Sequence, residues 1–105
     1  MQPVTQPTKT RLHALSRSPY QTDIDAMLRC VMPQDALLLL QDGVIAALGQ
    51  GNVATRLLAL GIPVYALRED VEARGLVEQI STAIPLVDYT EFVRLTAQHA
   101  VQLAW

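Results

Sequence analysis

The chain has 105 residues, of which 50 % are hydrophobic and only 17 % are charged. This length predicts a single domain with its own core, but a domain this small has difficulty hiding so many apolar side chains. We therefore expect other subunits to cover part of its surface, the alternative being a compact monomer with a few exposed leucines. The net charge of −2 and the scattered Lys and Arg residues disfavour direct binding to nucleic acid. A single cysteine excludes an internal disulfide and no apolar run could span a membrane, so a reducing cytoplasm is the expected location.

The N-terminal part is predicted to contain a leader followed by the first strand. Residues 1–11 are rich in Gln, Pro and Thr and show no hydrophobic periodicity, which is typical of a flexible leader outside the fold. The domain is therefore expected to span residues 12–105. The apolar segment 12–16 is a plausible first strand.

A helix is predicted after this strand. Ser18 is expected to be its N-cap, with Pro19 at the first helical position and Gln21 closing a capping box. Thr22 is a second candidate for the cap. Apolar residues then recur at helical spacing until Pro33, which ends the helix.

The central feature of the sequence is the unbroken apolar run 36–40. A run this short without polar punctuation predicts a strand covered on both faces, as in a parallel sheet with helices on each side. The run stops at Gln41, Asp42 and Gly43, where the chain turns into the next element. Ligands gather at the carboxyl ends of strands in open α/β sheets, so these residues mark a candidate site.

The remaining elements alternate between helix and strand. Asp42 is expected to cap a short helix over 43–48, and Asp88 and Glu91 form a predicted capping box for the helix that carries Phe92. The other expected elements are helices at 53–60 and 69–74 and strands at 63–67, 84–88 and 101–105. This alternation predicts an α/β fold: a single domain with a mostly parallel sheet of four or five strands and helices on both faces.

A glycine pattern raises the question of nucleotide binding. Residues 49–54 match the dinucleotide fingerprint G-x-G-x-x-A. The fingerprint functions directly after a strand, where a helix N-terminus meets the pyrophosphate, whereas here it follows a predicted helix. Loop glycines are therefore the better interpretation, and no cofactor is expected.

Cysteine and histidine chemistry is also weakly supported. Cys30 is the only possible thiol nucleophile, but it falls in the last turn of its helix, where the dipole disfavours a thiolate. We expect a structural, partly buried cysteine; the alternative is an autonomous thiol sulfurtransferase that uses Cys30. His13 and His99 each lack a second ligand at metal spacing, so no metal site is expected.

Two further features leave alternatives open. Asp42, Glu69, Asp70 and Arg74 are candidates to line the crevice at the carboxyl ends of the strands, although a solvated helix face explains the last three equally well. Trp105 is unusual at a chain end. It either docks on the core of its own domain or anchors an interface.

Several segments, taken in order, carry a family resemblance: Leu12-His13-x-Leu15-x-Arg17-Ser18-Pro19, Leu39-Leu40-Gln41-Asp42-Gly43-Val44, Val64-Tyr65-Ala66-Leu67-x-Glu69-Asp70, Ala73-Arg74-Gly75-Leu76, Val87-Asp88-Tyr89-Thr90-x-Phe92-Val93-x-Leu95-Thr96 and Ala104-Trp105. Together they resemble the TusB/DsrH family of small sulfur-relay subunits, over nearly all of residues 12–105. The resemblance implies a DsrEFH-like α/β domain assembled with TusC/DsrF-like and TusD/DsrE-like partners as a heterohexamer with two copies of each.

The resemblance also implies a function. Such complexes relay persulfide sulfur toward 2-thiouridine at the tRNA wobble position, or handle sulfur in dissimilatory oxidation. The nucleophilic cysteine belongs to the TusD-like partner, and matching Arg74-Gly75 to that partner's Arg-Gly pair puts Leu67, or a neighbouring residue, at the cysteine position. This chain is thus expected to be a non-catalytic subunit, without a cofactor. The candidate family-motif or interface residues are Gln41, Asp42, Gly43, Asp70, Arg74, Gly75, Asp88, Tyr89, Phe92 and Trp105.

Overall fold

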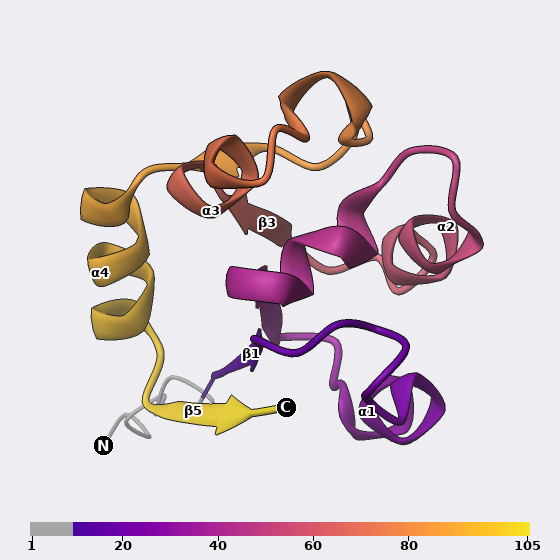
Figure 1. The fold of residues 1–105 in the computed structure, drawn as a ribbon. Helices are drawn as coiled ribbons and strands as arrows, with labels where there is room; N and C mark the ends of the chain where they lie inside the picture. The colour runs from indigo at the N-terminus through magenta and orange to yellow at the C-terminus, as the bar shows by residue number, and fades with distance from the viewer. Residues whose placement is uncertain (1–9) are drawn as a thin grey trace, which may run out of the picture.

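The structure, a computed structural model, describes residues 10–105, so residues 1–9 of the predicted leader lie outside the described part. Within residues 10–105, five parallel strands form one sheet in the order β4-β3-β2-β1-β5 (Figure 1). Their bounds are β1 Arg11–Leu15, β2 Ala36–Leu39, β3 Val64–Leu67, β4 Leu86–Val87 and β5 Val101–Ala104. The predicted α/β class with a mostly parallel sheet of four or five strands is confirmed, and the sheet has five strands.

Helices cover both faces of this sheet, as predicted. They are α1 (Ile24–Cys30), the 3-10 helix η1 (Gln41–Ala47), α2 (Asn52–Leu58), α3 (Arg68–Ala73), the 3-10 helix η2 (Val77–Gln79) and α4 (Tyr89–Gln98). The core residues of α1, η1, α2 and α3 belong to one cluster, whereas α4 packs on the opposite face. None of the helices in the described part of the chain is long and apolar enough to cross a membrane.

Alternate residues of β2 divide the core into its two layers. Leu37 and Leu39 point into the larger cluster with Met27 of α1, and Leu38 points into the smaller one with Phe92 of α4. All four residues of β2 are at most 3 % exposed. Full burial on both faces is the physical reason why this strand is an uninterrupted apolar run, because each leucine so buried contributes about 1.5–3 kcal/mol.

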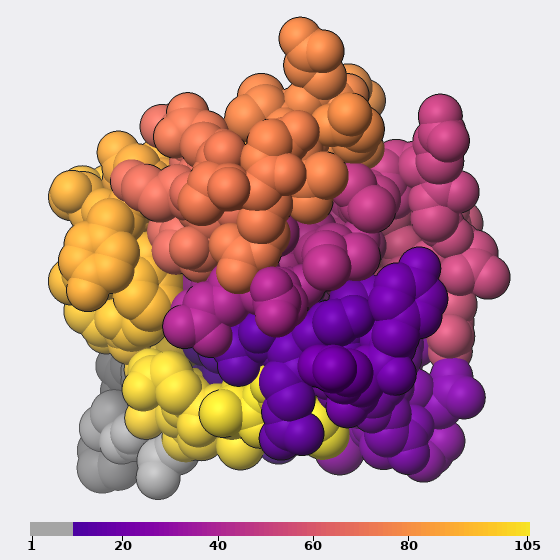
Figure 2. Space-filling model, viewed as in Figure 1, coloured from indigo at the N-terminus to yellow at the C-terminus, as the bar shows by residue number. Residues whose placement is uncertain are grey.

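The path of the chain brings its first strand and its last strand together. From β1 the strands proceed outward to β4, and α4 then returns the chain to the other side of β1. Strand β5 pairs with β1 in register from Arg11↔Val101 to Ala14↔Ala104. Figure 2 shows the yellow C-terminal segment against the indigo segment at the start of the described residues. Because Arg11 already pairs with Val101, β1 begins one residue earlier than predicted.

The predicted start of the first helix is wrong. The cap of α1 is Asp23, whose side chain accepts a hydrogen bond from the N–H of Ala26 at 3.0 Å, and neither Ser18 nor Thr22 has this role. Ser18 instead closes a tight turn, in which its carbonyl accepts the N–H of Gln21 at 2.9 Å. This turn consumes the segment predicted as the first helical turn, so the helix starts later.

The predicted cap at Asp42 is also wrong, whereas the capping box of α4 is confirmed. Helix η1 already begins at Gln41, without a side-chain cap, and the Asp42 carboxylate faces Arg74 instead. At the start of α4 the N–H of Glu91 donates to Asp88 at 2.8 Å, and the Glu91 side chain accepts the N–H of Asp88 at 3.2 Å.

Candidate functional site at the carboxyl edge of the sheet

Four of the predicted site residues meet where β2 and β3 end. The backbone N–H of Gln41 donates to the Asp70 carboxylate at 2.6 Å. The Arg74 guanidinium donates to the Asp42 carboxylate at 2.9 and 3.1 Å and to the backbone carbonyl of Asp70 at 3.1 Å. Three of the four crevice candidates therefore form one hydrogen-bonded group with Gln41, whereas Glu69 does not belong to it. We call this group the edge cluster: Gln41, Asp42, Asp70 and Arg74.

The topology explains why these residues meet. Helix η1 follows β2 and α3 follows β3, and parallel neighbouring strands end at the same edge of a sheet. Gln41 turns the chain with a φ of +51°, a left-handed conformation that is costly for a residue with a side chain. The short bond from its N–H to Asp70 compensates for part of this cost, because a carboxylate is a strong acceptor.

Gly43 makes the close approach of η1 to β1 possible. A Cβ atom at this position would lie 1.9 Å from the carbonyl oxygen of Leu15. The same carbonyl accepts the N–H of Leu40 at 3.0 Å, which fixes the end of β2 beside the end of β1. Gly43 is therefore required by packing, and it holds the edge cluster against the sheet.

A second set of candidates lies at the junction of α3 and α4. The Glu69 carboxylate accepts the N–H of Tyr89 at 3.2 Å, so the start of α4 is tied to α3. The rings of Tyr89 and Phe92 lie 5.5 Å apart, centre to centre. Phe92 packs on the smaller core cluster, whereas Tyr89 is 60 % exposed and available to a partner.

Leu67 and Gly75 frame the same edge. Leu67 is the last residue of β3 and only 6 % of it is exposed, so an aliphatic side chain fills the position at the strand end. Gly75 follows α3 with a φ of +66°, which glycine adopts without steric cost. Neither residue supplies a nucleophile, an acid or a base.

The chemistry available at the edge cluster is hydrogen bonding and charge. Its two carboxylates are matched by one guanidinium and one backbone N–H, and Asp42 and Arg74 are partly exposed, which limits such an ion pair to about 0–1 kcal/mol. Among residues 10–105, no group of three His, Cys, Asp or Glu side chains is placed to hold a metal ion. The edge cluster is therefore suited to structure and recognition.

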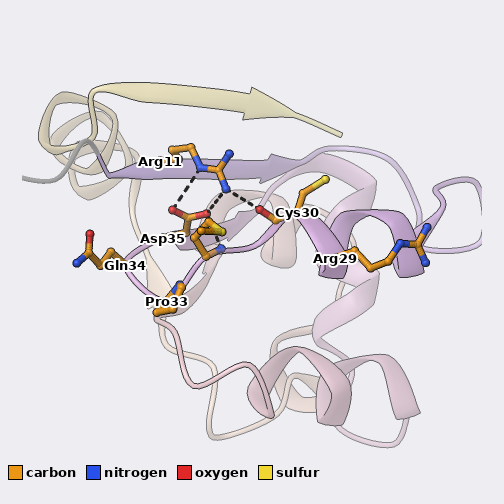
Figure 3. A pocket seen from close by; sticks show the side chains of 7 residues that line it. Arg11, Arg29, Cys30, Pro33, Gln34 and Asp35 are labelled. Carbon is orange, nitrogen blue, oxygen red and sulfur yellow. Dashed lines mark hydrogen bonds and ion pairs between the residues drawn. The ribbon is translucent and has the colours of Figure 1, made fainter.

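Cys30 lies at the opposite edge of the sheet, and the prediction that it is partly buried is wrong. It is exposed at the last residue of α1, because the helix ends there and the side chain falls beyond the buried stripe. The thiol lines a cavity of about 720 Å³ together with Arg11, Met32 and Asp35. Figure 3 shows the Arg11 guanidinium between the Asp35 carboxylate and the backbone carbonyl of Cys30.

The sequence reasoning missed a buried polar group beside this cavity. The Asp35 carboxylate lies 2.7 Å from His13 Nε2, and the Trp105 indole N–H donates to His13 Nδ1 at 3.0 Å. Arg11 and the N–H of Met32 also donate to Asp35, at 3.0 and 2.9 Å. The sequence did contain a signal for this group. His13 is a polar residue within the mostly apolar strand β1, and Asp35 directly precedes the apolar strand β2.

The environment of Asp35 lowers the pKa of this carboxyl. Burial by itself raises the pKa, but the hydrogen bonds from the N–H of Met32, from His13 and from Arg11 outweigh that effect. The carboxylate is thus held in its charged form. Of the two predictions for Trp105, docking on its own domain is the one observed, since the indole packs against the larger core cluster.

The glycine pattern lies in a loop and not after a strand. Residues 49–51 connect η1 to α2, where the N–H of Gly49 donates to the carbonyl of Gln79 at 2.8 Å. Leu48 and Ile80 form an isolated antiparallel bridge beside it. These contacts give the glycines a structural role in joining η1 to the segment after η2.

Fold and site together define a small parallel α/β domain with a hydrogen-bonded group of charged side chains at the carboxyl edge of its sheet. The chain belongs to the DsrH-like family: the model described as "DsrH like protein" matches residues 17–102. It is 58 % identical over 94 residues to "Protein TusB" of Pectobacterium parmentieri, covering 90 % of this chain and 99 % of that protein.

Two solved structures share the fold. The crystal structure of the ychN protein from E. coli superposes with a TM-score of 0.70 at 18 % identity, covering 92 % of this chain and 98 % of that one. The solution structure of protein Tm0979 from Thermotoga maritima has a TM-score of 0.61 at 29 % identity, covering 84 % and 92 %. The fold is thus that of known single-sheet α/β proteins.

Proposed function

We propose that this chain is a non-catalytic subunit of a sulfur-relay complex, in which a homologous partner carries the reacting cysteine. The observation that carries the proposal is the buried leucine at the end of β3. Matching Arg74-Gly75 to the Arg-Gly pair of a TusD-like partner aligns the nucleophilic cysteine of that partner with Leu67 or a neighbouring residue. Since a persulfide needs a sulfur atom, an aliphatic side chain at this position cannot take part in the transfer.

The complex we propose is a heterohexamer with TusC/DsrF-like and TusD/DsrE-like subunits, two copies of each. Its product is persulfide sulfur delivered toward 2-thiolation of the tRNA wobble uridine, in the cytoplasm. A DsrH-type role in dissimilatory sulfur oxidation is the variant of the same proposal. Membership of the DsrH-like family and the high identity to a protein named TusB support this assignment.

The surface of the chain fits a role in assembly. Tyr89 and Val93 lie one turn apart on α4 and are 60 % and 49 % exposed, so they present an apolar stripe on a helix that buries little of itself. The edge cluster adjoins the start of this helix through the bond between Glu69 and Tyr89. An apolar stripe next to a fixed charged group is a suitable docking surface for a related subunit.

Co-expression of the chain with its two homologous partners tests the proposal. Native mass spectrometry should detect a complex with two copies of each subunit. Transfer of labelled persulfide sulfur through that complex should be unchanged by Cys30→Ser and abolished by replacing the partner's cysteine. Loss of transfer in an intact Cys30→Ser complex would reject the non-catalytic role.

The second candidate function is an autonomous thiol sulfurtransferase, and the exposure of Cys30 beside a cavity favours it. Against it, the C-terminal end of a helix destabilises a thiolate. Incubation of the isolated chain with a persulfide donor decides between the two. The subunit proposal expects no sulfur atom to be retained on Cys30 and passed on to an acceptor thiol, whereas the enzyme requires both steps.

A further inference from the structure

Three side chains that are distant in the sequence meet near the end of β5: His13, Asp35 and Trp105. His13 is 0 % and Asp35 is 2 % exposed, and His13 and Trp105 are 92 residues apart in the chain. The His13 ring bridges the other two, with its Nε2 on the Asp35 carboxylate at 2.7 Å and its Nδ1 on the indole at 3.0 Å. Nothing in the proposed sulfur relay uses this group.

The hydrogen bonds determine where the proton of the imidazole lies. An indole N–H only donates, so Nδ1 of His13 must be the acceptor and carries no proton. The ring proton is then on Nε2, which donates to Asp35. His13 is therefore neutral in this arrangement, and a second proton can bind only at Nδ1.

Protonation at Nδ1 is incompatible with the contact to Trp105. It would place two N–H donors face to face across 3.0 Å, in a position where the indole N–H has no other described acceptor. The ring centres are 6.2 Å apart with their planes at 23°.

The charges around His13 are already balanced before it takes up a proton. Asp35 is paired with Arg11 and also accepts the N–H of Met32. Arg29 and Cys30, from α1, line the adjoining cavity, and Figure 3 shows the Arg29 side chain extending away from Asp35. Strand β5 carries no titratable side chain. A protonated His13 would thus add a positive charge to a buried site whose carboxylate, Asp35, is already paired.

We propose that His13 and Trp105 form a proton-operated latch on the edge strand β5. Protonation of His13 at Nδ1 releases the indole and loosens the end of β5 from β1. The backbone bonds at stake are the N–H of Trp105 to the carbonyl of Ala14, at 2.9 Å, and the N–H of Ser16 to the carbonyl of Trp105, at 3.3 Å. The latch is a regulatory device: protonation of His13 opens this end of the edge strand.

The sequence provides its own reporter, because Trp105 is the single tryptophan. Hydrogen exchange of the indole N–H is followed by NMR on the full chain from roughly pH 8 to roughly pH 5, the range in which histidines titrate. Rates are divided by those of free tryptophan at each pH. Protection should fall about tenfold or more on loss of the bond, in step with the ring protons of His13.

Two variants make the test specific. His99→Gln removes the other histidine, which lies at the end of α4, and should leave the transition unchanged. His13→Asn keeps an acceptor where Nδ1 was but does not titrate in this range, so its indole protection should not depend on pH. If His13→Asn does not fold, as judged by far-UV circular dichroism, the wild-type titration with the His99→Gln control decides alone.

The latch is rejected by any of three results. Indole protection persists while the His13 ring titrates; the loss of protection persists in folded His13→Asn; or His13 stays neutral until the whole domain unfolds. The proposed relay function is untouched by these outcomes, because none of them measures sulfur transfer or the assembly of the complex.

Discussion

Gly43→Ala is the substitution for which the structure gives the sharpest expectation. The added Cβ would lie 1.9 Å from the carbonyl oxygen and 2.7 Å from the carbonyl carbon of Leu15. Both atoms belong to the backbone of a central strand, so neither can rotate away as a side chain could. Helix η1 must therefore move away from β1.

The size of the effect follows from what this movement breaks. Overpacking a filled interior costs typically about 1–3 kcal/mol. The N–H of Leu40 then loses its bond to the carbonyl of Leu15, which adds about 1 kcal/mol. Together these give a loss of about 3 kcal/mol in the free energy of unfolding, or about 12–24 °C in Tm for a domain of this size.

Urea unfolding followed by far-UV circular dichroism measures this loss. The matched control is Gly51→Ala, because Gly51 has a φ of −88° and a Cβ there would meet its nearest neighbour at an ordinary 3.5 Å. Gly51 is the N-cap of α2, so the alanine variant loses a favoured cap residue but also lowers the entropy of the unfolded chain, and it should stay within about 1 kcal/mol of wild type. A cost below about 1 kcal/mol for Gly43→Ala, or an equal cost for both variants, would refute the packing argument.

Three further predictions concern the core and two charged groups. Leu39→Ala, at a site with no exposure, should lower the free energy of unfolding by about 2–5 kcal/mol in urea, and a loss under 1 kcal/mol would contradict the two-sided burial of β2. Asp35→Asn should cost about 3 kcal/mol near neutral pH. Folding lowers the pKa of Asp35, so the difference in unfolding free energy between wild type and Asp35→Asn should be constant above about pH 4, the pKa of an unfolded aspartate. This difference should be lost as the pH falls through the pKa of Asp35 in the folded protein. A difference that grows in acid would contradict the prediction. Arg56→Ala removes the side-chain bond and the charge that lower the pKa of the exposed Asp25, so NMR titration should give a higher pKa for Asp25 while the urea midpoint stays unchanged.

The parts of the fold that sequence predicts well are those encoded in local patterns. The apolar run 36–40 predicts a strand buried on both faces, since an exposed element would place some of these consecutive leucines in water. The pair Asp88 and Glu91 fixes the start of α4, because both bonds of a capping box lie within four residues. The edge cluster was predicted from strand ends, and topology alone brings its members together.

The sequence-based predictions that failed have two physical causes: several residues compete for one helix cap, and some contacts join residues far apart in the sequence. Ser18, Thr22 and Asp23 are all competent caps, and the turn that Ser18 makes decides in favour of Asp23. The bond between His13 and Trp105 depends on β5 lying beside β1, which no local pattern encodes. Sequence reasoning therefore predicted the sheet and its covering helices correctly. It missed the polar group of His13, Asp35 and Trp105, which joins the first strand to the end of the last one.

The pairing of β5 with β1 has a consequence for how the protein is made. During translation, one flank of β1 stays without its hydrogen-bonding partner until the final strand has left the ribosome. An open strand flank can recruit other chains, and contacts this remote in sequence form slowly. The nascent polypeptide is thus most prone to aggregate after β1 has emerged and before β5 has followed, and a ribosome stalled in that interval would present a sheet with an unprotected side.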